Sequence, residues 1–575
     1  MSVIDWIVLG VTLLAVLLVG VYKSKGQKDL NTYFKSNNSM SWFIILLSIM
    51  GTQASAITFL SAPGQAYTDG MRFVQYYFGL PLAMVVLCIT FVPIFHKLKV
   101  YTAYELLENR FDSKTRTLTA LLFLIQRGLS TGISIYAPSI ILSSLFGWNI
   151  YFTNVFMGGL LIIYTVSGGA KAVAYTQMQQ LFVVFTGMFL AGYMVVKLLP
   201  EEISFIDALK VAGNLGKLNI IETKIDVTDA AWWKDKYNIW SGLIGGFFLF
   251  LSYFGTDQSQ VGRYLTAKNL RESRLGLLMN GLVKVPMQFL ILLIGALVFV
   301  FYLNYSSPVI FNQTLLDKTL TTPFKDSLVK MQSAYEHLNG KKQTQTLALV
   351  NAMNSKDKAA MDQAKAALTQ TVQQSEEIRK EVKKTIVKAD KLADTNDTNY
   401  IFLYFVIHHL PRGLIGLLIA VIFLSAWGSI AAALNSLAST SIIDLYMRGE
   451  RQNKSEFHYF KASQWITLFW GLFSIAVAMF ASKLGSLIEA VNVLGSLFYG
   501  TILGIFMVAF YMKKIGGKAV FWAAIITEVL VITIYIADII SFLWLNLIGC
   551  LLVMGVAWII QSWFSKPLFK EAENT

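Results

Sequence analysis

Polar residues interrupt an apolar stretch near the start of this sequence, and their types suit the binding of a small cation. Residues 48–59 read Ser-Ile-Met-Gly-Thr-Gln-Ala-Ser-Ala-Ile-Thr-Phe. Gly51 and the hydroxyl residues around it favour a local break in a helix, and a break frees main-chain carbonyl oxygens that can bind a cation. The alternative is a small-residue packing face whose hydroxyls bond back to their own helix. The residue types alone do not separate the two.

A second polar cluster begins at Ser425 and continues to Ser441. Residues three and four apart share a helix face, which gives one small, partly hydroxylated stripe made of Ser425, Ser429, Ala432 and Ser436. This stripe could complete an oxygen cage beside the broken helix. The same residues would also suit close helix packing.

Two basic residues lie inside apolar sequence, where an unpaired charge is costly and usually functional. They are Arg127, which follows Gln126, and Lys284 in the sequence Val-Lys-Val-Pro. The planar guanidinium of Arg127 suits a carboxylate. Either base could instead be paired with Asp257 or Glu489 and have only a structural role.

The composition shows which elements must position these groups. The chain has 575 residues, of which 55% are hydrophobic and only 14% are charged, so lipid is its main solvent. Apolar stretches long enough to span a bilayer, about 20 residues each, recur about thirteen times. They lie near 3–22, 41–62, 72–97, 116–145, 150–166, 175–199, 239–257, 275–303, 413–446, 463–483, 485–511, 519–540 and 543–563. We therefore expect an all-α polytopic membrane protein.

Basic residues in the short loops predict the orientation, because Lys and Arg hold a loop on the cytoplasmic side. If the N-terminus is outside, the inner loops hold clusters such as Lys97, Lys99 and Arg110, whereas the short outer loops are nearly bare. This places the protein in the cell membrane with a cytoplasmic C-terminus. The net charge of +14 is then mostly a topology signal, and we expect no nucleic-acid partner.

One segment, 304–400, breaks the apolar rhythm and is rich in Lys, Ala, Gln and Thr. From Lys325 to about Asp394 it should form a helical hairpin in water outside the membrane. It is either a solvated decoration or a docking surface for an external partner. The predicted organisation is spans one to eight in 1–303, this insertion, spans nine to thirteen in 401–563, and a cytoplasmic tail in 564–575.

Other functional classes lack their signatures here. A channel would show a re-entrant filter or a repeated pore motif, and an intramembrane enzyme would show a paired-Asp, Ser-His or H-E-x-x-H constellation. With only Cys88 and Cys550, no thiolate metal site is expected. We expect no enzyme and no cofactor.

Residues 255–269 read GTDQSQVGRYLTAKN, which resembles the signature of the sodium/solute symporter family, G-T-D-Q followed by V-Q-R-Y-L and A-K-N. Three further stretches agree in order and spacing: Ser55–Phe59 with Pro63, Ser167–Val173, and Asp444–Tyr446. The resemblance implies an inverted repeat of five helices, the first of each being discontinuous. These would be spans two to six, about 41–199, and spans seven to eleven. Membrane lipid, sodium and a small solute would be the partners.

The resemblance also implies a sodium site and two departures from the family pattern. Its ligands would be the carbonyls of Gly51, Ala54 and Ser425 and the hydroxyls at 428 and 429, which makes Ser429 the remaining hydroxyl because position 428 is Gly428. Family members usually have Asp where this chain has Gln177, and that Asp accompanies a second sodium in some of them. We expect at most one sodium ion per cycle.

Candidate solute-binding residues follow in the same way. Arg127 is similar to the carboxylate-binding Arg of sialic acid symporters, and Lys284 resembles a sugar-contacting Lys of the sodium/galactose members. The other candidates are Gln53, Ser55, Thr58, Gln75 and Asp257. We therefore predict a sodium-coupled symporter that imports a sugar or a carboxylated sugar such as sialic acid by alternating access. The alternatives are a symporter of a small monocarboxylate and a sensor without net transport.

Overall fold

A computed structural model describes residues 1–24, 39–98, 100–167, 170–391, 393–447 and 455–564. Within these ranges the chain is helical, and the only extended pairing is one isolated bridge between Met40 and Ala267. Part of the family-like motif, Gly168 and Gly169, and nearly all of the predicted tail at 564–575 lie outside the described residues.

Eight helical segments of the described chain are long and apolar enough to cross a bilayer. They are Ala56–Leu98, Ser113–Phe146, Val173–Lys197, Leu270–Asn304, Leu414–Tyr446, Leu487–Tyr511, Gly517–Ile536 and Phe542–Trp563. Shorter apolar helices are Val3–Val19, Trp42–Gln53, Ile150–Val166 and Ser241–Gly255. The all-α membrane architecture is confirmed, and the number thirteen stays a prediction.

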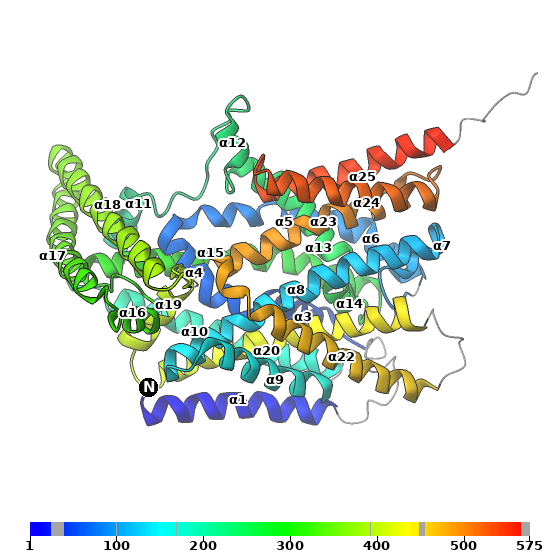
Figure 1. The fold of residues 1–575 in the computed structure, drawn as a ribbon, viewed down its shortest axis with the longest axis horizontal. Coiled ribbons are helices and arrows are strands. Elements are labelled where there is room, and N and C mark those ends of the chain that lie inside the picture. Colours follow the sequence, from blue (N-terminus) through cyan, green and yellow to red (C-terminus); the bar gives the residue numbers. More distant parts are fainter. Residues whose placement is uncertain (25–38, 99, 168–169, 392, 448–454, 565–575) are drawn as a thin grey trace, which may run out of the picture.

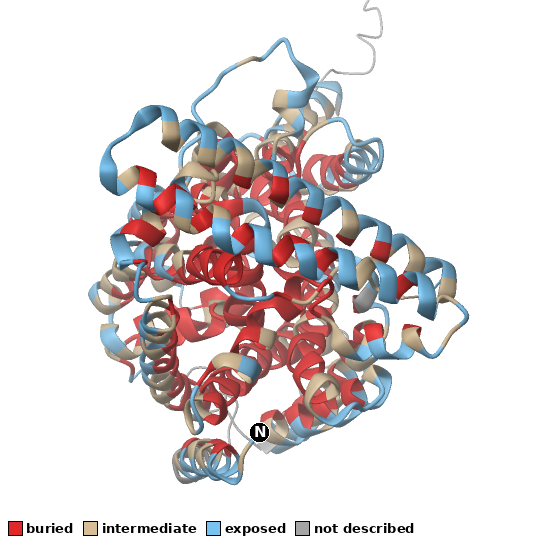
Figure 2. Ribbon diagram, turned by 90° about the vertical axis from the view of Figure 1, so that its left-hand side faces the viewer, coloured by how far each residue is buried: buried red, intermediate tan, exposed pale blue. Residues whose placement is uncertain are grey.

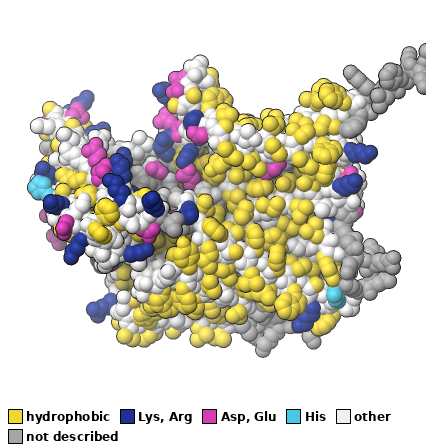
Figure 3. Space-filling model, viewed as in Figure 1, with side chains coloured by type: hydrophobic (Ala, Val, Ile, Leu, Met, Phe, Trp, Pro, Cys, Tyr) yellow, Lys and Arg dark blue, Asp and Glu magenta, His cyan; other side chains and the backbone are white. Residues whose placement is uncertain are grey.

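The flank of the molecule is apolar, as a lipid-facing surface must be. Figure 3 shows hydrophobic side chains covering the side of the helix bundle, while charged side chains gather mainly toward its ends. Large apolar side chains of the bundle are strongly exposed, for example Phe182 and Phe189 of α10, each 76% exposed. Apolar surface of this extent is typical of contact with lipid rather than water.

The helices that surround the middle of the bundle have the following bounds: α3 Trp42–Gln53, α4 Ala56–Asp69, α5 Leu80–Ile89, α8 Ser113–Phe146, α10 Ala170–Lys197, α13 Gly246–Gly255, α14 Gln258–Tyr264, α15 Leu270–Asn304, α20 Leu414–Thr440 and α23 Leu487–Tyr511. They lie roughly along one direction (Figure 1). α15 packs on α3, α4 and α5, α10 packs on α3 and α20, and α8 packs on α20 and α23.

The outer helices complete the bundle and its edges. They are α1 Val3–Ser24, α6 Phe91–Leu98, α7 Glu105–Arg110, α9 Ile150–Ser167, α11 Phe205–Asn214, α12 Ala230–Lys234, α19 Thr398–His409, α22 Glu456–Ala478, α24 Gly517–Ile536 and α25 Phe542–Phe564. A 3₁₀ segment, Gly70–Tyr77, joins α4 to α5.

Two of the inner spans are discontinuous. α3 ends at Gln53 and α4 begins at Ala56, so the break in this span lies at Ala54 and Ser55, a few residues beyond Gly51. α13 ends at Gly255, and Asp257 caps the start of α14 by accepting a hydrogen bond from the main-chain N–H of Ser259. Helix ends inside a membrane leave unpaired main-chain groups, which are tolerated only where the protein encloses them or a cavity solvates them.

The stretch predicted as a hairpin consists of two long helices, α17 Lys325–Ser355 and α18 Lys358–Ala389, preceded by the short α16 Gln313–Leu320. The pair lies across one end of the bundle (Figure 2). Arg379 of α18 fixes it there through a hydrogen-bonded ion pair with Asp397, 2.9 Å, just before α19. The paired cations Arg379 and Lys383 hold the pKa of Asp397 below its usual range although burial opposes them.

Candidate functional site

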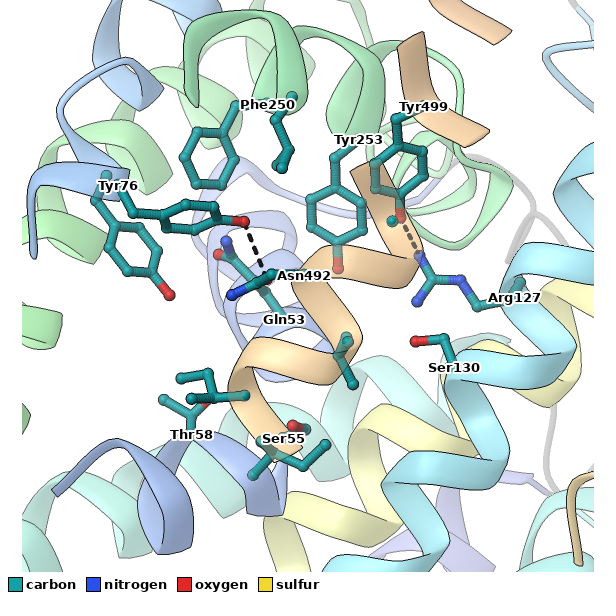
Figure 4. Close-up of a pocket in the computed structure, with 16 residues that line it drawn as sticks. Gln53, Ser55, Thr58, Tyr76, Arg127, Ser130, Phe250, Tyr253, Asn492 and Tyr499 are labelled. Atoms are coloured by element: carbon teal, nitrogen blue, oxygen red, sulfur yellow. Dashed lines mark hydrogen bonds between the residues drawn. The ribbon is translucent and has the colours of Figure 1, made fainter. Parts of the chain in front are cut away.

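The break between α3 and α4 forms one wall of a buried cavity of about 90 Å³. Its polar lining combines predicted and unpredicted residues (Figure 4): Gln53, Ser55, Thr58, Tyr76, Tyr77, Arg127, Ser130, Tyr253, Asn492 and Tyr499. Phe250 and aliphatic side chains such as Leu249 and Val491 complete it. A small cavity that is lined by polar and aromatic side chains and lies beside a broken helix has the character of a polar-solute site.

Two amide groups in this lining are free to recognise a ligand. The Oε1 atom of Gln53 is buried and has no hydrogen-bond partner among the described residues. The same is true of Nδ2 of Asn492, whose Oδ1 accepts a hydrogen bond of 3.1 Å from the Tyr76 hydroxyl. Because buried polar groups normally have partners, these two atoms are suited to hold a solute or ordered water.

Arg127 of α8 supplies the positive charge of the cavity and is already partly paired. Its Nη2 atom donates to the Asp257 carboxylate and, at 3.2 Å, to the Tyr499 hydroxyl. Its Cζ atom lies 5.5 Å from the centroid of the Tyr253 ring. The Nε–H has no partner among the residues described. The structural pairing considered from the sequence is therefore present, and one face of the guanidinium still borders the cavity.

Asp257 lies behind Arg127 and does not line the cavity. It is 1% exposed and accepts hydrogen bonds from the hydroxyls of Tyr499 at 2.9 Å and Ser259 at 2.6 Å. In this arrangement it orients Arg127 rather than facing a solute.

Two further predicted solute residues also lie outside the cavity lining. Gln75 uses its amide to bind the loop that precedes α13: it donates to the carbonyl of Tyr237 at 2.9 Å and accepts from the N–H of Glu222 at 3.0 Å. Lys284 of α15 lies behind Tyr77, with its ammonium 5.9 Å from the ring centroid. The other suggested acidic partner, Glu489, is paired with Lys236.

Six polar lining residues were not among the predicted ones, namely Tyr76, Tyr77, Ser130, Tyr253, Asn492 and Tyr499. Asn492 could have been found, because it is an amide inside an apolar span and such groups are usually functional. The tyrosines could not be identified as lining residues from the sequence, because aromatic residues recur throughout the spans.

The predicted sodium ligands lie where α3 approaches α20, and Gln177 of α10 lies between them. Its Nε2 donates to the Gly428 carbonyl at 3.0 Å and to the Thr52 hydroxyl at 3.1 Å, while its Oε1 accepts from the Ser48 hydroxyl at 2.8 Å. Gly51 must lack a side chain here, since a Cβ atom would lie 2.9 Å from Cβ of Gln177. A neutral amide thus cross-links the helices at this point.

Gly428 also has a steric explanation. A Cβ atom at this position would overlap Oε1 of Gln180, which lies three residues beyond Gln177 on α10. The amide oxygen of Gln180 thus occupies the space beside Gly428 that a side chain would need.

Ser425 and Ser429 bond within α20. The Ser429 hydroxyl donates to the Ser425 carbonyl at 2.8 Å, and the Ser425 hydroxyl donates to the Val421 carbonyl at 2.7 Å. Both hydroxyl oxygens keep lone pairs through which they could coordinate a cation. The carbonyls at the end of α3, including those of Gly51 and Ala54, provide further oxygen atoms near the break.

Comparison with known proteins identifies the family. The family model described as the sodium:solute symporter family matches residues 33–311 and 385–527, which is well over half of the chain. The chain belongs to this family. The segment between the two matched ranges, 312–384, contains α17 and most of α18, so the hairpin is largely an addition to the family core.

Individual relatives agree with this assignment. The chain is 25% identical to the sodium/sialic acid symporter SiaT of Proteus mirabilis over 99% of its length and 96% of that protein. It is 23% identical to the sodium/sialic acid symporter NanT of Aliivibrio fischeri, and 30% identical to the human sodium/iodide cotransporter over 46% of its own length and 40% of that protein. A solved Na⁺-coupled sialic acid symporter in a substrate-bound outward-open state superposes with a TM-score of 0.74 at 22% identity, covering 98% of both chains.

These matches confirm the predicted family and the role of sodium as its coupling ion. The fold is that of the solved sialic acid symporter. The family consists of Na⁺-coupled transporters and not of enzymes, and its members lie in membranes as multi-pass proteins.

Proposed function

We propose that this member of the sodium:solute symporter family imports a hydroxyl-rich organic acid, such as sialic acid, together with sodium. The observation that carries this proposal is Arg127, whose guanidinium borders the cavity beside the α3–α4 break. Ser55, Thr58 and the free amide atoms of Gln53 and Asn492 offer hydrogen bonds to hydroxyl groups. SiaT and NanT, which match this chain over nearly its full length, are named as sialic acid symporters, and this favours the same solute class.

Sodium would bind between α3 and α20 as a single ion. Gly51 and Ala54 would contribute carbonyl oxygens, Ser425 a carbonyl and Ser429 a hydroxyl, a set of hard oxygen donors that suits Na⁺. The amide of Gln177 brings no negative charge, and its hydrogen bonds to Thr52 and Gly428 already join the two helices. A second sodium ion would lack its usual charge compensation here.

The membrane arrangement we propose has thirteen spans with an inverted repeat of spans two to six and seven to eleven. The breaks at Ala54–Ser55 and Thr256–Asp257 support it, because each would fall in the first span of one repeat. The N-terminus and the α17–α18 hairpin would face the outside, and the C-terminus would face the cytoplasm.

Alternating access would connect the cavity with a larger one of about 810 Å³ nearer the hairpin. Both are lined by α23: Ile488 and Asn492 face the smaller cavity, whereas Glu489 and Val493 face the larger one. The smaller cavity is below the roughly 300 to 1,000 Å³ of typical ligand pockets, so a sugar acid needs its walls to move. Such a movement would accompany solute entry.

The test is uptake into proteoliposomes under an imposed sodium gradient, across monosaccharides, sialic acid and short monocarboxylates. We expect sodium-stimulated uptake of sialic acid or a similar hydroxylated acid, with a Hill coefficient for Na⁺ near one. Uptake of the same solute without any sodium stimulation would refute the coupling.

A second candidate solute is a short monocarboxylate. The human sodium-coupled monocarboxylate transporter 1 is 29% identical over 48% of this chain, and the cavity of about 90 Å³ suits a small anion without rearrangement. The same uptake panel separates the two. Solute counterflow addresses the sensor alternative, since a sensor would bind solute but show no exchange.

A further inference from the structure

α15 carries a polar face that is buried within the membrane region. Asn280, Lys284 and Gln288 are 0%, 1% and 0% exposed. Their spacing of four residues places them along one side of the helix. Polar groups in such positions are costly and usually functional.

The two amides of this face have no partners. Neither polar atom of Asn280 and neither polar atom of Gln288 forms a hydrogen bond with any residue that the structure describes. Four such atoms on one helix face are unusual, because buried amides in folded proteins are nearly always satisfied. These four atoms are therefore suited to bind a polar ligand or ordered water.

The contacts of neighbouring glycines show where this face points. A side chain on Gly276 would overlap Ile45 of α3, and one on Gly295 would overlap Pro63 of α4. At about 100° per residue, Asn280 and Lys284 lie at helical angles between these two contacts, and Gln288 lies about 20° beyond Gly295, toward the side where Gly281 meets Met84 of α5. The face is thus turned toward the span that is broken at Ala54 and Ser55 and toward α5.

Tyr77 stands between this face and the solute cavity. The Tyr77 ring lines the cavity, and the ammonium of Lys284 lies 5.9 Å from the centroid of the same ring. The Tyr77 ring packs edge-on against Phe73 and Tyr76 and stacks on Phe250. These neighbours are all aromatic, so a rotated Tyr77 ring could form new aromatic contacts in place of the ones it loses. A displaced Tyr77 would enlarge the small cavity toward α15.

We propose that Asn280 and Gln288, on either side of Lys284, form a second wall of the solute site that takes the hydroxyl-bearing part of the solute when Tyr77 moves aside. Each amide both donates and accepts hydrogen bonds, which matches a hydroxyl group. Arg127 would hold the carboxylate of the same molecule on the opposite side. This inference rests on the proposed function, because it assigns the second half of that site.

The test replaces the two amides by apolar side chains of similar size, in the variant Asn280→Leu/Gln288→Met. Thermal unfolding and sodium-dependent binding are measured for sialic acid and for a short monocarboxylate such as lactate. We expect the variant to unfold at the same temperature as the wild type or higher, since it loses only unpartnered groups. Its affinity for sialic acid should fall by about tenfold or more, whereas its affinity for lactate should change by less than about twofold.

A matched control is Asn546→Leu, which removes a buried Asn whose amide donates to Ser496 at 2.9 Å and to the Leu543 carbonyl at 3.0 Å. It should lower the unfolding temperature and leave the ratio of the two affinities unchanged. If the double variant binds both solutes like the wild type, or loses both equally, the second wall is refuted while the proposed function stands. If the wild type binds neither solute, the proposed function and this inference both fall.

Discussion

The side-chain amide of Gln177 donates a hydrogen bond of 3.0 Å to the main-chain carbonyl oxygen of Gly428. The same Nε2 atom donates to Thr52, so one neutral group joins α10, α20 and α3. Sodium is expected to join two of these helices when it binds. The amide thus supplies part of that connection through hydrogen bonds from a neutral group.

Replacing Gln177 by Asp should make this connection depend on a cation. A carboxylate cannot donate to the Gly428 carbonyl, and its buried charge would have no partner, which costs on the order of 1–3 kcal/mol or more. In sodium-free buffer we expect the Gln177→Asp variant to unfold at a lower temperature than the wild type. Added Na⁺ should restore much of that loss, and the Hill coefficient for sodium-driven uptake should rise above one.

The control for this variant is Gln177→Leu, which removes the hydrogen bonds without adding charge. It should be destabilised to the same extent at every sodium concentration. An Asp variant that behaves in this way, with no response to Na⁺, would contradict the role given to the amide.

Replacing Gly428 by Ser should be mildly destabilising unless Gln180 is shortened as well. The new Cβ atom would overlap the amide oxygen at the end of the flexible Gln180 side chain, so Gln180 has to move aside, at a cost of about 1 kcal/mol, the low end for overpacking. Gln180→Ala clears the space. We expect the double variant to recover stability and to bind Na⁺ several-fold more tightly than the wild type, because a hydroxyl ligand returns. A double-mutant cycle of unfolding and sodium affinity measures this, and strictly additive effects would show that the two positions are independent.

These two positions show what the sequence could and could not predict. The sequence identifies both as departures from a family pattern: Gly428 is interpreted as the loss of a hydroxyl ligand for sodium, and Gln177 as the loss of a negative charge that accompanies a second sodium ion in some members. The hydrogen bond between the two positions could not be predicted from the sequence. Gln177 and Gly428 are 251 positions apart, and the contact depends on which side-chain rotamers fit between three packed helices.

The fold was easier to predict than the site. Long apolar runs and the motif at 255–269 were sufficient for an all-α membrane protein of this family, because lipid permits few other structures. Gln53 and Gln75 illustrate the limit. Both are amides in or beside the second span, yet Gln53 faces the cavity and Gln75 is saturated by the carbonyl of Tyr237 and the N–H of Glu222. Only the path of the loop that carries Glu222 and Tyr237 distinguishes the two positions.

Replacing Arg127 by Gln should weaken the binding of a carboxylated solute by roughly tenfold to a hundredfold, the range for a charged hydrogen bond. It also leaves the Asp257 carboxylate buried beside Tyr499 without its cation, so the single variant should be less stable. The double variant Arg127→Gln/Asp257→Asn removes that charge and should recover stability but not affinity. Binding by calorimetry and unfolding by fluorescence separate the two effects. Recovery of solute affinity in the double variant would show that Arg127 acts only as the counter-charge of Asp257.

The junction between the hairpin and the bundle should respond to pH through two neighbouring carboxyl groups with opposite trends. Burial raises the pKa of Asp394 to about 6, against the hydrogen bond from the Asn396 N–H. Its contribution to stability is complete below about pH 4, where it is protonated in both the folded and unfolded states, and is lost as the pH rises through 6. The pKa of Asp397 is lowered, so its contribution is present above about pH 4 and is lost at lower pH.

Asp394→Asn should therefore stabilise the protein at pH 7, by up to about 2 kcal/mol, and have little effect near pH 4. Asp397→Asn should instead destabilise it at pH 7, because Arg379 loses its buried partner, and this penalty should shrink as the pH falls below 4. Hydrogen exchange of α18 and α19 at pH 4.5 and 7 measures both effects at the junction itself. If the two variants shift protection in the same direction at pH 7, the environment assigned to Asp394 is wrong.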